Sequence, residues 1–214
     1  MVAVDISGFL RQGLDEMGIT YTAANIVILE KYISELTLWN RKLGLVKAEG
    51  RALIVNHIFD SLAPLPLLKA MGFTTMADAG SGAGLPGIPL ALFLPEKQIT
   101  LIERSAKRSG FLLNALSVLH LHRNVSLCGT PVEEVKEQFD VVVLRAFRQL
   151  TEFYTLLMNL LHPGGVLFAY KGKRETILRE TAPLQGYAEI EIIKVTVPFL
   201  ESERHILKLR KYHQ

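Results

Sequence analysis

Apolar side chains recur every three or four residues through the first part of the chain, which is the spacing of a helix face. One such stripe lies within residues 6–17 and a second within residues 26–36. Gly18 and Thr22 fall between the stripes, where a helix stop and a new N-cap are expected. The pattern therefore predicts two amphipathic helices joined by a short turn.

A third helical pattern follows in residues 52–72, ALIVNHIFDSLAPLPLLKAMG. Its two prolines should bend or divide the helix, because proline lacks the backbone N–H that a helix interior needs. Up to Gly72 the sequence predicts helices only. We expect residues 1–72 to form an N-terminal helical extension, or cap.

From Thr74 onward, short β-rich runs alternate with helical ones. Such alternation predicts a mostly parallel sheet with helices on both faces. The predicted strands are residues 75–80, 98–103, 124–128, 139–146 and 165–172, and the intervening helices should begin near Pro86, Ser105, Pro131 and Thr151.

Two further β-rich runs end the chain, at residues 188–200 and 204–211, with the polar link 201–203 between them. They predict an antiparallel hairpin at the edge of the sheet. The fold class is thus α/β, with a mostly parallel twisted sheet, a C-terminal antiparallel hairpin and an N-terminal helical cap. We expect residues 73–214 to form one compact core.

A glycine-rich loop lies between the first predicted strand and the following helix. Gly82, Gly84 and Gly87 fit the pattern G-x-G-x-x-G, in which glycines let the backbone turn sharply and approach a ligand closely. The pattern alone is shared by nucleotide-binding folds in general. Glu103 adds context, because an acid about 20 residues beyond such a loop can bind a nucleoside ribose. Alternatively, Glu103 is a solvated carboxylate or a partner for Arg104.

Asp78 lies just before the glycines, where it could face the amino group and sulfonium of S-adenosylmethionine but would repel a diphosphate. This placement favours the methyl donor over NAD. A simple role in capping the next turn is the alternative.

Composition bounds these interpretations. The chain has 214 residues, 49% of them hydrophobic, and a net charge of +3 that would help to attract phosphates without requiring them. Cys128 is the single cysteine, which excludes an intramolecular disulfide. The apolar runs are too short to span a membrane and no signal peptide is visible. We expect a cytoplasmic monomer that binds no membrane and no metal.

Several motifs occur in a recognisable order along the chain. They are residues 38–42, 57–62 and above all 78–89, DAGSGAGLPGIP, with further landmarks at Lys107-Arg108, Val132-Glu133-Glu134, Arg145-Ala146-Phe147, Tyr170-Lys171-Gly172 and Glu203-Arg204-His205. Together they resemble a known family, the bacterial 16S ribosomal RNA guanine-N7 methyltransferases, also called glucose-inhibited division protein B. The similarity covers roughly residues 30 to 210.

The resemblance implies a Rossmann-like class I methyltransferase that uses S-adenosylmethionine to methylate N7 of a guanine in the 530-loop region of 16S rRNA, on the free RNA or the small ribosomal subunit. It further implies that Gly80 and Leu85 contact the cofactor, that Glu103 holds its ribose, and that Val132 and Glu133 flank the adenine. Arg145 would complete the site. With Asp78, Gly82 and Gly84, these residues form the expected cofactor site. For Glu133 and Glu134, favourable placement in the first turn of a helix is the alternative.

The chain departs from the family pattern at three places. The segment from Leu43 to Val46 replaces an Asn-Leu-Thr element, Pro131 stands where an arginine is common, and Leu144 replaces a serine before Arg145. These changes bear on RNA and adenine contacts and leave the glycine loop intact.

No catalytic base is assigned, because guanine N7 carries an exposed lone pair and the reaction can depend on positioning. His57 and Asp60 would share one helical face near the cofactor, as a functional pair or as an ordinary surface pair. With Arg145 they are the possible catalytic residues. The candidates for RNA binding are Trp39, Arg41, Lys42, Lys107, Arg108, Arg148, Lys171, Lys173, Arg174 and Arg204. Trp39 could stack on a base or be partly buried.

Two other functions remain open from the residues alone. An NAD-dependent oxidoreductase would share the glycine loop and Glu103. A non-catalytic RNA-binding module would bind RNA in a salt-dependent way and transfer no methyl group.

Overall fold

A computed structural model describes residues 5–145 and 150–211. Its seven-stranded sheet has the order β3-β2-β1-β4-β5-β7-β6. The first five strands pair in parallel and the last two are antiparallel, which confirms the predicted sheet and C-terminal hairpin. The strands are β1 (Thr75–Ala79), β2 (Gln98–Ile102), β3 (Val125–Cys128), β4 (Phe139–Arg145), β5 (Leu161–Lys171), β6 (Ala188–Val195) and β7 (Arg204–Lys211).

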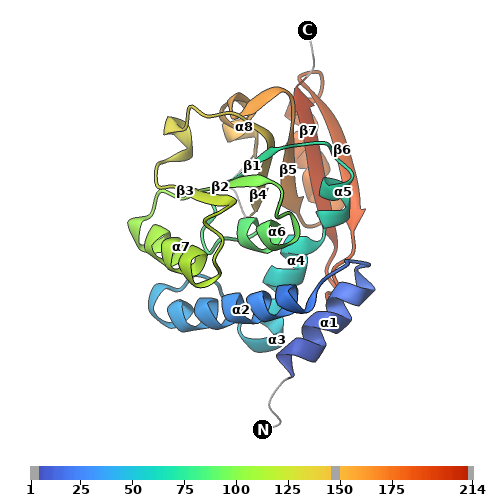
Figure 1. Ribbon diagram of the computed structural model, residues 1–214. Coiled ribbons are helices and arrows are strands. Elements are labelled where there is room, and N and C mark those ends of the chain that lie inside the picture. The colour runs from blue at the N-terminus through green and yellow to red at the C-terminus, as the bar shows by residue number, and fades with distance from the viewer. Residues whose placement is uncertain (1–4, 146–149, 212–214) are drawn as a thin grey trace.

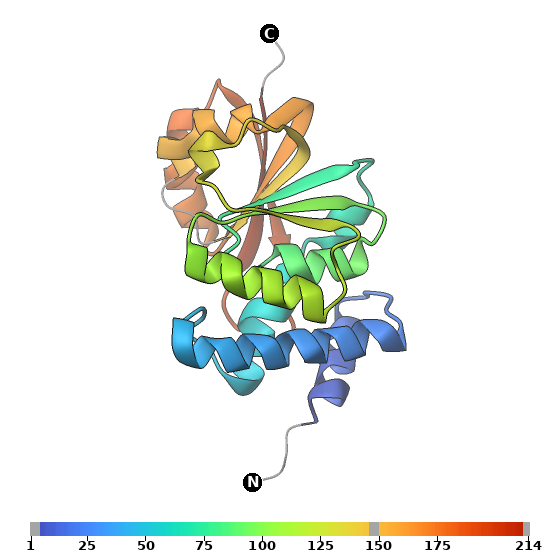
Figure 2. The ribbon, with the colours of Figure 1, turned by 60° about the vertical axis from the view of Figure 1, so that its left-hand side comes forward.

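Helices cover both faces of the sheet (Figures 1 and 2). One face packs against α8 (Leu150–Asn159) and α9 (Arg174–Thr181). The other packs against α6 (Gly87–Phe93) and α7 (Ala106–Val118), with the N-terminal helices beyond them in the same continuous apolar core. Alternate strand residues serve the two faces, as the period of two requires.

The first two helices begin and end close to where the sequence predicts. Helix α1 (Ile6–Glu16) is capped by Asp5, and α2 (Ala23–Leu43) by Thr22, which forms a reciprocal capping box with Asn25. Such caps satisfy backbone N–H groups that have no partner within the helix.

The third helical segment is divided, as its prolines predict. It consists of α3 (Gly50–Leu53), a π-helical turn (Ile54–Phe59), α4 (Asp60–Leu62) and α5 (Leu65–Lys69). The π-helical turn carries His57 and was not expected. It interrupts the regular α-helical spacing on which the shared face of His57 and Asp60 was predicted.

One predicted helix and one predicted strand end are wrong, and one helix was not predicted. Residues after Pro131 form only a 3₁₀ turn (Val132–Glu134) and not the predicted helix. The connection to β4 must return along the length of that strand, about 23 Å, whereas residues 131–138 would span only about 12 Å as a helix. Helix α9 was not predicted. Strand β6 ends at Val195 instead of residue 200, because the following loop contains Pro198, which cannot donate to a strand ladder.

Within the described residues, no helix is long and apolar enough to cross a membrane.

Candidate functional site

The glycine loop follows β1 at the carboxyl edge of the sheet. Gly80, Gly82 and Gly84 have φ angles of 77°, 58° and 79°, in the left-handed region that glycine adopts without strain. A Cβ on Gly84 would come within 2.4 Å of the Cδ1 atom of Ile88. A Cβ on Gly82 would have only the Gly80 carbonyl nearby, at 3.9 Å. Gly84 is therefore required by packing, whereas Gly82 faces open space.

Asp78 is fully buried at the end of β1. Its Oδ2 atom accepts a hydrogen bond from the backbone N–H of Gly87 at 2.9 Å, so it does tie the start of α6 to the strand. Its Oδ1 atom is buried and accepts no hydrogen bond from any described residue. Burial raises the pKa of Asp78 to about 7. A buried carboxylate with one unused oxygen is suited to a cationic group of a ligand.

Glu103 follows β2, and its carboxylate is also buried. Its Oε2 atom accepts from the N–H of Gly82 at 2.9 Å and its Oε1 atom from the N–H of Ser105 at 2.8 Å. Arg108, and not Arg104, approaches it, with 3.9 Å between Nη1 and Oε2. Each carboxylate oxygen can accept a second hydrogen bond, so Glu103 orders the glycine loop and retains acceptor capacity for a ribose.

Val132 and Glu133 lie in the 3₁₀ turn after β3. Val132 is buried in the same apolar cluster as Ala79 and Ile102, the last residues of β1 and β2, whereas Glu133 is exposed. Leu85 is buried in the glycine loop and Gly80 is exposed. The structure thus gathers the predicted cofactor residues around the ends of β1, β2 and β3.

Arg145 ends β4 and points toward the N-terminal helices. Its Nη1 atom lies 3.3 Å from Oδ2 of Asp60 and donates to the carbonyl of Asn56 at 3.2 Å. The other oxygen of Asp60 accepts from Nε of Arg204 at 2.9 Å. Asp60 therefore pairs with two arginines, and among the described residues no hydrogen bond joins it to His57. Burial and, to a smaller extent, the positive charge of Arg145 together lower the pKa of His57 to about 4.

Two tyrosines join the helical layer to the site, and no pattern in the sequence indicated either contact. The hydroxyl of Tyr32, in α2, donates to the carbonyl of Ala83 in the glycine loop at 2.6 Å. The hydroxyl of Tyr170, in β5, donates to the carbonyl of Ser61 at 2.7 Å. Both tyrosines are buried, and burial raises their pKa values well above the usual range.

Comparisons with known proteins assign this arrangement to a family. The family model described as rRNA small subunit methyltransferase G matches residues 25–207. The chain belongs to this family. A relative of that name from Aromatoleum aromaticum is 39% identical over 211 residues, which cover 94% of this chain and 97% of the relative. Another relative of that name, from Burkholderia thailandensis, is 37% identical over 213 residues, which cover 95% of this chain and 91% of the relative.

Solved structures show the same fold. A putative O-methyltransferase from Klebsiella pneumoniae aligns with a TM-score of 0.64 at 14% identity, over 97% of this chain and 96% of its own. TYW2 from P. horikoshii, in complex with MeSAdo, aligns with a TM-score of 0.56 at 12% identity, over 80% of this chain and 67% of its own. The Rossmann-like methyltransferase fold is confirmed. Family membership also confirms that the chain is an S-adenosylmethionine-dependent methyltransferase.

The residues at the carboxyl edge of the sheet fit this cofactor. The unused, buried oxygen of Asp78 matches its positive charge, and the open side of Gly82 leaves room for it. The acceptor oxygens of Glu103 suit its ribose hydroxyls.

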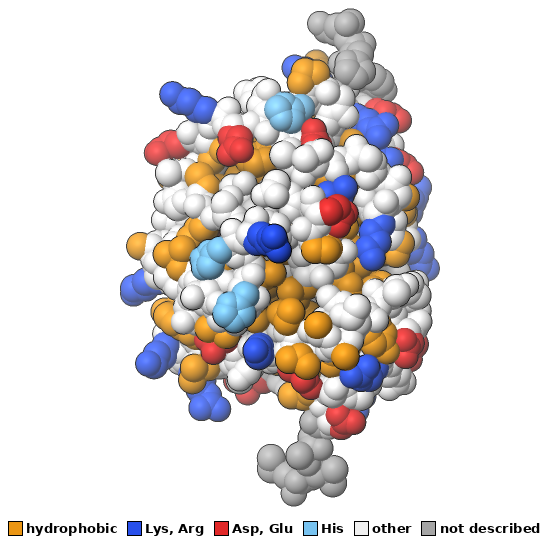
Figure 3. Space-filling model, viewed as in Figure 1, with side chains coloured by type: hydrophobic (Ala, Val, Ile, Leu, Met, Phe, Trp, Pro, Cys, Tyr) orange, Lys and Arg blue, Asp and Glu red, His pale blue; other side chains and the backbone are white. Residues whose placement is uncertain are grey.

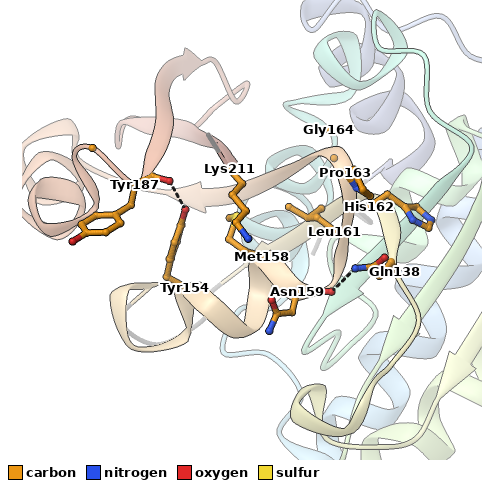
Figure 4. Close-up of a pocket in the computed structure, with 12 residues that line it drawn as sticks. Gln138, Tyr154, Met158, Asn159, Leu161, His162, Pro163, Gly164, Tyr187 and Lys211 are labelled. Atoms are coloured by element: carbon orange, nitrogen blue, oxygen red, sulfur yellow. Dashed lines mark hydrogen bonds between the residues drawn. The ribbon is translucent and has the colours of Figure 1, made fainter. Parts of the chain in front are cut away.

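A cavity of about 890 Å³ lies at the opposite end of the sheet (Figure 4). It is bounded by the end of α8, the start of β5 and the end of β7, including Tyr154, Met158, Leu161 and Lys211. None of the predicted site residues lines it. Its size alone assigns it no function.

The RNA candidates divide into exposed and paired residues. Arg41, Lys42, Lys107 and Arg108 are exposed at the end of α2 and the start of α7, which meet through the edge-to-face contact of Trp39 with Phe111. Figure 3 shows Lys and Arg side chains along this flank, at the lower left. Trp39 is partly buried by its contact. Lys171 forms an ion pair with Glu180, and Arg204 forms one with Asp60. Lys173 and Arg174 are exposed. Arg148 lies outside the described residues.

Proposed function

We propose that this protein transfers the methyl group of S-adenosylmethionine to N7 of a guanine in the 530-loop region of 16S rRNA, as a cytoplasmic monomer. The observation that carries the proposal is the buried Asp78 with its unused oxygen beside the glycine loop, in a chain of the small-subunit rRNA methyltransferase family.

The residues proposed to hold the cofactor each have a distinct task. Asp78 faces the positively charged methionine end, and Gly80, Gly82, Gly84 and Leu85 shape the loop around it. Glu103 binds the ribose. Val132 and Glu133 flank the adenine, and Arg145 closes the site from β4. These assignments are supported by the position of the residues around the carboxyl ends of neighbouring strands, where open α/β sheets bind ligands.

The chemistry needs orientation more than proton transfer. The bound cofactor supplies an electrophilic methyl group, and guanine N7 attacks it with a lone pair that carries no proton. His57, whose pKa is lowered to about 4, is neutral near pH 7 and has a buried Nδ1 atom without a described partner. His57 and Asp60 therefore shape the substrate side of the site in this proposal, and no general base is needed.

The α2–α7 flank, defined by Arg41, Lys42, Lys107 and Arg108, is proposed to bind RNA phosphates. These four side chains are exposed. The flank adjoins the carboxyl edge of the sheet through Arg108, which approaches Glu103. Phosphate contacts of this kind position a nucleic acid without reading its sequence.

Isothermal titration calorimetry with S-adenosylmethionine, and in parallel with NAD, tests the cofactor part of the proposal. We expect binding of S-adenosylmethionine and no heat from NAD. Binding of NAD alone would instead favour the oxidoreductase. RNA binding with no cofactor binding would favour a non-catalytic module.

A further inference from the structure

Four charged side chains of alternating sign lie on the helical side of the sheet's carboxyl edge. In the strand register Asp78 is opposite Val143, Arg145 is opposite Tyr170, and Tyr170 is opposite Ile206. Because alternate residues of a strand share a face, Asp78, Arg145 and Arg204 all point to one side of the sheet. Asp60, from α4, lies between the two arginines and forms an ion pair with each.

Among the described hydrogen bonds, Asp60 is the only residue that contacts both arginines. Its side chain is 8% exposed, and its two oxygens are divided, one for Arg145 and one for Arg204. Arg204 is fixed further by Nη1 contacts to Ser202 and to the Glu203 carbonyl, both at 3.0 Å. Arg204 thus fixes one oxygen of Asp60, and the other oxygen of Asp60 fixes the guanidinium of Arg145.

Arg145 has a competing partner on its own face of the sheet. The unused Oδ1 atom of Asp78 is buried on the adjacent strand, and an arginine released from Asp60 would be attracted to it. That oxygen is the one that the proposed function assigns to the cationic end of the cofactor. A guanidinium turned toward Asp78 would compete for it.

We propose that Asp60 is a positioning residue of the cofactor site, which holds the guanidinium of Arg145 against the helical layer and so keeps the Oδ1 atom of Asp78 without a protein partner. The inference rests on the proposed cofactor site but not on the RNA substrate. Asp60 acts through Arg145 and need not touch the ligand.

A double-mutant cycle on ligand binding tests this role. The probe is S-adenosylmethionine, titrated by calorimetry without RNA. Asp60→Asn, which keeps the side-chain shape but removes the charge, should weaken binding about tenfold. In an Arg145→Gln background the same substitution should change affinity by less than about twofold, because no guanidinium remains to be positioned.

The matched control is Asp140→Asn. Asp140 also ties separate segments together, since its Oδ2 atom accepts from the N–H groups of Thr74 and Thr75, but it lies at the opposite edge of the sheet. This variant should lose thermal stability and keep wild-type affinity. A purely structural role of Asp60 would make the two variants behave alike.

Arg204→Gln provides a second route if Asp60→Asn does not fold. It loosens Asp60 from the other side and should weaken binding about threefold, again only while Arg145 is present. Unchanged ligand affinity in the folded variants would overturn this inference but not the cofactor site. The same holds if the effects of the two substitutions on affinity multiply in the double variants. Failure of the unaltered protein to bind the probe would overturn the cofactor site and the inference with it.

Discussion

The hydroxyl of Tyr32 donates a hydrogen bond to the carbonyl of Ala83 at 2.6 Å and so joins α2 to the glycine loop. The two residues are 51 positions apart, and both are buried. The N-terminal helices therefore do more than cover the sheet, because one of them fixes the loop that is proposed to hold the cofactor.

Tyr32→Phe should remove this bond and leave the buried carbonyl of Ala83 without its partner. We expect a loss of about 1–3 kcal/mol in the free energy of unfolding, measured by urea denaturation, and weaker S-adenosylmethionine binding by calorimetry. Tyr154→Phe is the control, because the Tyr154 hydroxyl donates to the Tyr187 carbonyl far from the loop. Equal effects of both variants on affinity would contradict the account.

The glycines of the loop should respond differently to substitution. Gly84→Ala should mainly destabilise the fold, because its Cβ would meet Ile88. Gly82→Val should abolish cofactor binding by placing a branched side chain on the ligand side, with strain from its φ of 58° as a second cost. Thermal unfolding and calorimetry separate the two effects. A folded Gly82→Val variant with wild-type affinity would remove the loop from the site.

The raised pKa of Asp78 gives a pH dependence with a defined sign. In the unfolded chain this carboxyl loses its proton near pH 4, whereas in the folded chain it does so at about pH 7. Between these values the folded state binds the extra proton, so this group's contribution to stability falls as pH rises from about 4 to about 7.

Asp78→Asn should remove that contribution, so its melting temperature relative to wild type should be higher at about pH 8 than at about pH 5. Cofactor affinity in the wild type should instead rise toward pH 8, as the carboxylate forms, and the variant should lose most of it. A difference in melting temperature that does not depend on pH would show that Asp78 is ionised throughout.

The α2–α7 flank predicts a change in salt dependence. Replacing Arg41 and Lys42 together by glutamine should weaken RNA binding and reduce the slope of log K against log salt by about 1.5, if each contacts one phosphate. Replacing Arg179 and Lys211, which are exposed elsewhere, is the charge-matched control. Equal slopes for the two double variants would move the RNA surface away from this flank.

The parts of the site that the sequence predicts are local in the chain. Gly82, Gly84 and Glu103 follow strands whose apolar runs are unmistakable, and a parallel sheet necessarily brings the carboxyl ends of those strands together. The same logic placed Arg145 at that edge. The fold class, and the placement of these residues at one edge of the sheet, could therefore be inferred from the sequence alone.

The parts that the sequence did not predict depend on contacts between distant segments. Asp60 meets Arg145 across 85 residues and Arg204 across 144, and no spacing rule connects them. The π-helical turn around His57 was also hidden, because its apolar residues fit an ordinary helix equally well. Pairing of Arg108, instead of Arg104, with Glu103 depends on where α7 begins.

Mapping of methylated bases in 16S rRNA tests the proposed methyl transfer. Small subunits or 16S rRNA from cells that lack this protein would be incubated with the purified enzyme and S-adenosylmethionine, and the RNA analysed by nuclease digestion and mass spectrometry. We expect one new N7-methylguanine in the 530-loop region, absent when Gly82→Val replaces the wild type. A methyl group on another atom or in another region, or none on either substrate, would contradict it.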